Sequence, residues 1–122
     1  MVGSHEPPPY HQVGQAMHAY VRDLATRLDH LPTEPDDRWL EMLSFAEGRL
    51  LSIHPFADFN GRISRVFVDW LTRHLDLPDV DPTPDEGEAT ERYLAALRAG
   101  DRRDWQPLMA IWRERFEKGT AS

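Results

Sequence analysis

The sequence predicts an all-α domain of about five to six helices. Apolar residues recur every three or four positions in several separate segments, which is the spacing of one face of an α-helix. No segment alternates apolar and polar residues for long enough to predict a strand. The chain has 122 residues, which suits one compact domain with a single core. We therefore expect residues 1–122 to form a single helical domain.

The segment that precedes the first helix is predicted to be extended. Residues 1–12 include three consecutive prolines at positions 7–9, and prolines fix φ and remove backbone donors. The opening stretch Met1–His5 is compatible with an appended tag. A helix of about 17 residues is predicted next from its apolar spacing. Its stripe consists of Val13, Met17, Tyr20, Leu24, Leu28 and Leu31.

The next two helices flank a short polar loop. After a break at residues 32–36, the second stripe is Trp39, Leu43, Ala46, Leu50 and Ile53. This helix is predicted to stop at His54, because the residue before Pro55 avoids the α region. Residues 55–61 mix Pro, Asp, Asn and Gly, which predicts a loop. The third helix is predicted from Val66, Phe67, Trp70, Leu71, His74 and Leu75.

Two further helices follow a long acidic loop. The fourth is predicted from about Pro84 to Ala99, with Thr83 as its cap, because proline fits a first helical turn. Gly100 is expected to end this helix. Asp104 is expected to cap the last helix. The apolar stripe of this helix consists of Trp105, Leu108, Met109, Trp112 and Phe116.

Composition excludes several classes of protein. The net charge is −7, from 21 acidic and 14 basic residues, which argues against nonspecific binding to nucleic acid or to an anionic membrane. There is no cysteine, no apolar run of membrane length and no signal peptide, so we expect a cytoplasmic protein. All but one of the basic residues are arginine, a bias of GC-rich bacterial genes. The other five histidines do not have the sequence spacing of metal ligands: His5, His11, His18, His30 and His74.

The loop between the second and third helices carries the candidate site. Asn60 and Gly61 lie where a helix is expected to begin, and free amides at a helix start bind anions. Gly61 lets an anion approach the backbone closely. Arg62 and Arg65 are three residues apart, so they share a helical face. Two guanidinium groups beside a helix start are suited to a polyphosphate.

Three other loop residues complete this set. His54 titrates near neutral pH and can take the proton from an attacking hydroxyl. Asp58 follows four residues later, and a carboxylate beside phosphates commonly holds Mg²⁺. Phe56, the apolar aromatic residue between His54 and Asp58, is expected to plug inward and hold the loop. The alternatives are a structural histidine, a capping aspartate and solvated arginines, and they are less favoured because the residues occur together.

This segment resembles the Fic domain motif, His-x-Phe-x-Asp/Glu-Gly-Asn-Gly-Arg-x-x-Arg. The matching positions are His54, Phe56, Asp58, Asn60, Gly61, Arg62 and Arg65. The resemblance continues along the chain in order. An isoleucine, Ile53, precedes the motif, and the stretches 96–101 and 105–108 match later family patterns.

The resemblance implies a fold and a reaction. The fold would be a Fic-like helical bundle, with the prolines at 7–9 as the remnant of a β-hairpin flap that docks a target protein. The reaction would transfer AMP from ATP, as co-substrate, to a Ser, Thr or Tyr hydroxyl of that target. His54 would be the general base, with Arg62 also catalytic. Asp58 would hold Mg²⁺, and Asn60, Gly61, Arg62 and Arg65 would bind the phosphates.

Departures from the family pattern leave alternatives open. Phe59 stands where the family has Gly. The enzyme could therefore transfer UMP or phosphocholine in place of AMP, or remove AMP from a modified protein. A catalytically silent binding module or toxin–antitoxin component is a further alternative. Gly61 argues against the Doc kinases, which carry Lys there. The stretch 44–48 has one spacer too few for the family's inhibitory pattern. Inhibition would therefore come from a separate antitoxin-like protein or from flanking segments, or it would be absent.

Two smaller questions also stay open at this point. Tyr93 either lines a base pocket or packs in the core, and core packing is favoured. The protein either works in the cytoplasm or is delivered into a host cell as an effector.

Overall fold

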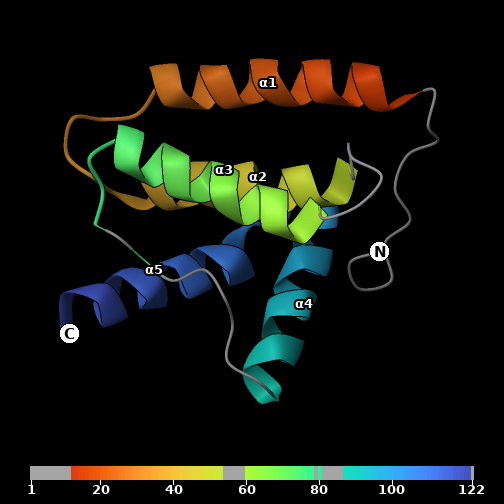
Figure 1. Cartoon of the computed structure of the whole chain (residues 1–122). Helices are drawn as coiled ribbons and strands as arrows, with labels where there is room; N and C mark the ends of the chain where they lie inside the picture. The colour runs from red at the N-terminus through yellow and green to blue at the C-terminus, as the bar shows by residue number, and fades with distance from the viewer. Residues whose placement is uncertain (1–11, 54–59, 79, 81–86, 122) are drawn as a thin grey trace.

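The computed structural model describes residues 12–53, 60–78, 80 and 87–121, which form five α-helices and no strand (Figure 1). The helices are α1 (Val13–Asp29), α2 (Asp37–Ile53), α3 (Asn60–His74), α4 (Glu88–Asp101) and α5 (Gln106–Ala121). The all-α prediction is therefore confirmed. Of the expected extended flap, residues 1–12, all but Gln12 lie outside the described residues, and Gln12 has the backbone angles of a helix start.

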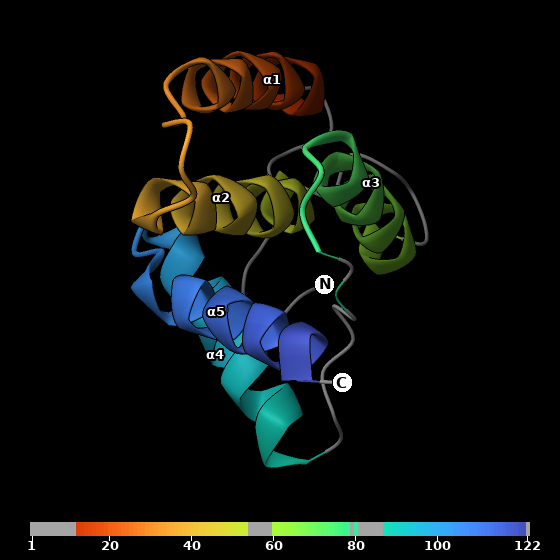
Figure 2. The same ribbon diagram turned by 90° about the vertical axis from the view of Figure 1, so that its left-hand side faces the viewer.

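Helix α2 lies at the centre of the domain. It contacts each of the other four helices, with α1 on one side and α4 and α5 on the other (Figure 2). From Met42 to Ile53 every residue of α2 is buried except the half-buried Arg49. The predicted stripe covered only one face of this helix. The neighbours on its other faces bury the rest, as in a helix that forms the core of a domain.

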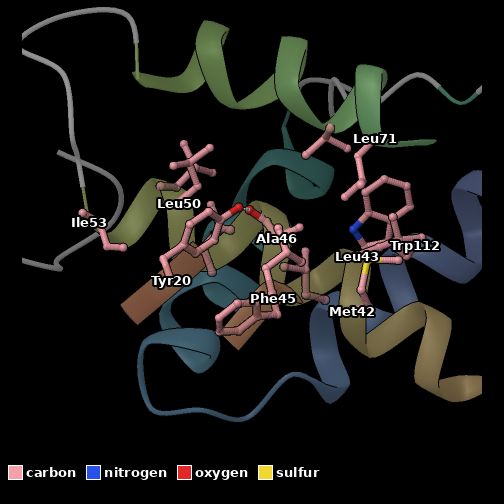
Figure 3. Packing of buried hydrophobic residues seen from close by; sticks show 14 of the residues in the cluster. Tyr20, Met42, Leu43, Phe45, Ala46, Leu50, Ile53, Leu71 and Trp112 are labelled. Atoms are coloured by element: carbon pink, nitrogen blue, oxygen red, sulfur yellow. Dashed lines mark hydrogen bonds between the residues drawn. The ribbon is translucent and has the colours of Figure 1, made fainter. Parts of the chain in front are cut away.

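The core joins all five helices into one cluster (Figure 3). Tyr20 of α1 shows how α1 attaches to α2. Its ring stacks on Phe45, with 5.6 Å between ring centroids, and its hydroxyl donates to the Ala46 carbonyl at 2.7 Å. Burial raises the pKa of Tyr20. The fully buried residues of greatest volume in the cluster include Trp112, Met42, Leu43, Ile53, Leu71 and Leu108.

The ends of α4 differ from the sequence prediction. The helix begins at Glu88, because Gly87 before it has φ 78°, which is not helical. The expected cap and first-turn proline, Thr83 and Pro84, lie outside the described residues. The helix also continues through Gly100 to Asp101, so the prediction that Gly100 ends it was wrong. By contrast, the predicted cap of α5 is confirmed, since the Asp104 carboxylate accepts a hydrogen bond from the backbone N–H of Gln106 at 3.2 Å.

Gly100 has a packing role in place of a capping role. A Cβ atom at Gly100 would lie 2.5 Å from Cζ3 of Trp105, and one at Gly48 would lie 2.7 Å from the same atom. Both distances are shorter than a carbon–carbon contact allows. The indole of Trp105 therefore occupies space that two glycines, on α2 and α4, leave open.

Candidate active site

The candidate motif spans the connection from α2 to α3. Helix α2 ends at Ile53, which agrees with the predicted stop before Pro55, and Ile53 is fully buried. Helix α3 begins at Asn60. Residues 54–59 lie outside the described residues, so the roles predicted for His54, Phe56 and Asp58 stay predictions. The structure does show that both ends of this connection belong to helices packed in the core, which holds a site more precisely than loops alone.

The start of α3 has the properties of an anion site. As expected, a helix begins at Asn60; Gly61, expected in the loop, belongs to its first turn. The amides of a first helical turn have no partner within the helix, and the helix dipole adds positive potential there. This turn contains no acidic residue, and the side chains of Arg62 and Arg65 are exposed. In an otherwise acidic chain, this turn thus combines two exposed arginines with no acidic residue.

Ser64, between the two arginines, faces the opposite way. It is 2% exposed, and its Oγ has no hydrogen-bond partner within the described part of the chain. Val68 and Leu71 are buried one and two turns further along, so this face packs against α2. Since residues 62 and 65 lie on the other side of the helix, burial of Ser64 directs both arginines outward. Sequence reasoning missed Ser64, whose only signal was a small side chain between two motif arginines.

A buried polar cluster on α2 was also missed. Glu47 is 2% exposed, and its carboxylate accepts hydrogen bonds from Arg115 of α5 at 2.8 and 3.2 Å. The hydroxyl of Tyr93, on α4, donates to the same carboxylate. Burial, and then the Glu47 charge, raise the pKa of Tyr93. Tyr93 also packs against the core, in agreement with the favoured interpretation of this residue.

This cluster ties α2, α4 and α5 together. Glu47 lies on α2 six residues before its last residue, Ile53, so the cluster fixes the helix that leads into the motif. The guanidinium of Arg115 also lies over the Trp112 ring, 4.6 Å from its centroid. These partners are 46 and 68 residues from Glu47 in the sequence. Local patterns carry no signal for a pairing over such a separation.

The described residues do not test the predicted magnesium site. Among them, no three or more His, Cys, Asp or Glu side chains gather in a way that would hold a metal ion. The predicted magnesium ligand, Asp58, is not one of them, so that prediction remains untested. Within the same residues, no helix has both the length and the apolar character needed to cross a bilayer.

Comparison with known proteins identifies the family. The model of the Fic/DOC family matches residues 2–72, more than half of the chain, and this span contains the whole motif segment 54–65. A uridine 5'-monophosphate transferase of Xanthomonas campestris pv. campestris (strain 8004) is 40% identical over 63 residues. That match covers 52% of this chain but 11% of the relative, so the chain spans only a small part of its length. No solved structure matches the chain significantly. The extent of the family match, together with the motif and the helix that starts within it, shows that this chain belongs to the Fic/DOC family.

Proposed function

We propose that this chain transfers a nucleoside monophosphate from a nucleoside triphosphate to a hydroxyl group of a target protein. The observation that carries the proposal is the start of α3. The first-turn amides, which have no partner within a helix, and two exposed arginines, Arg62 and Arg65, come directly after the predicted histidine and carboxylate in the chain. Phosphate transfer depends chiefly on positioning and on stabilising charge, and these groups are suited to both.

The proposed reaction has one nucleophile and one leaving group. The acceptor oxygen attacks the α-phosphorus, the bond from that phosphorus to the oxygen bridging the α- and β-phosphates breaks, and pyrophosphate leaves. His54 takes the proton of the acceptor hydroxyl as general base. Arg62 and Arg65, with the amides at Asn60 and Gly61, oppose the negative charge of the phosphates.

Mg²⁺ fits the predicted donor set. This ion is usually bound by one or two protein carboxylates, with phosphate and water oxygens in the remaining positions. Asp58 would be its protein ligand. When bound, Mg²⁺ would neutralise charge on the α- and β-phosphates. The chain's own contribution would be to hold the nucleotide against the α3 start while Phe56 secures the loop.

Two donors are the leading candidates. AMP from ATP is the first, because it is the commonest reaction in the family that the motif resembles. UMP from UTP is the second, and one observation favours it: the 40% identical relative is named as a UMP transferase. Phe59, in place of the usual glycine, is the residue of the motif most able to change the choice of donor. The target protein would dock through the flap, and an antitoxin-like protein would be the inhibitor.

The test is transfer of label from each of four α-³²P nucleoside triphosphates, with Mg²⁺, to lysate proteins and to the chain itself. His54→Ala should lower transfer by about 10²–10⁴-fold, the usual contribution of a general base. His18→Ala is the matched control, because His18 is exposed on α1 and distant in sequence from the motif. Label from ATP alone supports AMP transfer, and label from UTP alone supports UMP transfer.

Other outcomes separate the remaining alternatives. If none of the four nucleotides labels any protein, the silent binding module is favoured over a nucleotidyl transferase. Label that His54→Ala leaves unchanged would contradict the assigned base. A phosphocholine donor, or release of AMP from a modified protein, would be tested next if no nucleotide labels any protein. Circular dichroism of each variant checks that loss of activity does not reflect loss of the fold.

A further inference from the structure

The hydroxyl of Ser64 is a buried polar group of the motif segment to which the proposed reaction gives no role. Ser64 lies on α3, between Arg62 and Arg65, and is 2% exposed. Its Oγ has no hydrogen-bond partner within the described part of the chain. A hydroxyl removed from water without a partner costs free energy, and such groups are rare in folded proteins. The position of this one within the motif calls for a physical reason.

The packing of α3 keeps this hydroxyl away from water. Of the other four described helices, α3 contacts only α2, and Figure 2 shows it at the side of the domain. Its buried face includes two polar residues, Ser64 and Thr72, which an apolar pattern does not count. The inward face is therefore rotated away from Val66 and Trp70, which are 66% and 55% exposed. The prediction that these two residues face the core was wrong.

Two other buried hydroxyls, on α3 and on α2, do have a partner. The Thr72 hydroxyl donates to the Asp69 carbonyl, three residues earlier, at 3.0 Å. The Ser44 hydroxyl donates to the Leu40 carbonyl, four residues earlier, at 2.8 Å. Both make the bond that Ser and Thr commonly form inside helices, to a backbone carbonyl three or four residues back. Ser64 is buried in the same way but does not make this bond.

The carbonyls that the Ser64 hydroxyl can reach belong to the motif. Gly61 and Asn60 lie three and four residues before Ser64, in the first turn of α3. Rotation of the Ser64 side chain about χ1 brings its hydroxyl towards one of these carbonyls. In a regular α-helix the Asn60 carbonyl already accepts the Ser64 backbone N–H. A carbonyl oxygen has two lone pairs, so it can accept the hydroxyl as well.

A bond to the Asn60 carbonyl would act on the proposed phosphate site. The carbonyl of Asn60 and the N–H of Gly61 belong to one peptide group. In the proposed reaction, this N–H donates to a phosphate oxygen. A hydrogen bond accepted by the carbonyl polarises the peptide group and strengthens the bond that its N–H donates, and the reverse also holds. The Ser64 hydroxyl can therefore strengthen phosphate binding from the buried side of the helix.

We propose that Ser64 is a positioning residue of the nucleotide site. When a phosphate oxygen accepts the Gly61 N–H, the Ser64 hydroxyl donates to the Asn60 carbonyl and gains the partner that it lacks. Ser64 acts through this peptide group and does not touch the nucleotide. The inference rests on the proposed function, because it needs a phosphate at the start of α3.

The test compares Ser64→Ala with Thr72→Val. The affinities for ATP and for UTP, each with Mg²⁺, are measured by isothermal titration calorimetry, and stability is measured by urea unfolding. Ser64→Ala should weaken nucleotide binding about two- to tenfold, the effect of one hydrogen bond. It should not lower stability, because the hydroxyl that it removes has no partner. Thr72→Val removes a hydroxyl that has a partner, so it should lower stability and leave affinity unchanged.

The Gly61 amide signal in ¹H–¹⁵N NMR spectra is a second readout. Its proton should shift downfield when nucleotide saturates the wild type, and by less in Ser64→Ala, because the peptide group is then less polarised. Equal affinity of wild type and Ser64→Ala, a stability loss in Ser64→Ala as large as that in Thr72→Val, or no nucleotide binding by the wild type would each overturn the proposal. A chain that binds nucleotide with this dependence on Ser64 but transfers no label would support the proposal and contradict the proposed function alone.

Discussion

Breaking the buried ion pair between Glu47 and Arg115 should strongly destabilise the domain. The two side chains are only 3% and 7% exposed, so neither charge retains much of its hydration. Burial lowers the pKa of Arg115, but the charge and hydrogen bonds of Glu47 outweigh this and raise it overall. In Glu47→Leu the guanidinium of Arg115 would stay buried without its partner. Removing one member of a buried pair typically costs about 3–5 kcal/mol.

The double variant Glu47→Leu/Arg115→Met should be more stable than either single variant. Replacing both charges with apolar groups of similar size avoids the buried unpaired charge, and such replacements are often neutral or stabilising. A residual cost of about 1–3 kcal/mol is expected, because the Tyr93 hydroxyl loses its acceptor. The two substitutions should therefore be far from additive, as in other contacting pairs.

The differences in unfolding free energy are measured by urea unfolding, with tryptophan fluorescence and far-UV circular dichroism as the two probes of the transition. The matched control is the Arg92–Glu114 pair, whose two side chains are 51% and 46% exposed. Arg92→Met should cost less than about 1 kcal/mol, since exposed pairs are hydrated and screened. A stability loss in Glu47→Leu no larger than that in Arg92→Met would contradict the prediction. So would a double variant whose stability loss equals the sum of the losses in the two single variants.

Two further predictions concern packing and pH. Gly100→Ala should destabilise the domain by about 1–3 kcal/mol, because its Cβ would meet the Trp105 ring at 2.5 Å. Gly14 lies within α1, and a Cβ added there would meet no neighbouring side chain or helix within 4 Å. Gly14→Ala should therefore stabilise the domain by about 0.5–1 kcal/mol. Thermal unfolding of the two variants compares their stabilities. The pKa values of Tyr20 and Tyr93 are both raised, so the unfolded chain loses these protons first and stability should fall as pH rises above about 10. Each tyrosine should contribute a slope of about 1.4 kcal/mol per pH unit in urea unfolding, and Tyr93→Phe should remove one of the two.

One part of the candidate site, the start of α3, follows from local sequence. The spacing of Asn60, Gly61, Arg62 and Arg65 predicted a helix start with two arginines on one face, and the structure has α3 begin there with both arginines exposed. This succeeded because a helix start and its free amides depend on only a few neighbouring residues. The function of Ser64 in the packing of that turn could not be predicted, since it depends on which side of α3 meets α2.

The helical character of the chain, the end of α2 before Pro55 and the family that the motif resembles could all be predicted from the sequence alone. Each of these depends on residues close together in the chain. The pairing of Glu47 with Arg115, the space that Gly100 leaves for Trp105 and the outward position of Trp70 became known only from the packing of the helices. Helical spacing shows that an apolar side exists, but not which neighbour covers it. That choice depends on how helices distant in sequence pack, which the energy of the whole core decides.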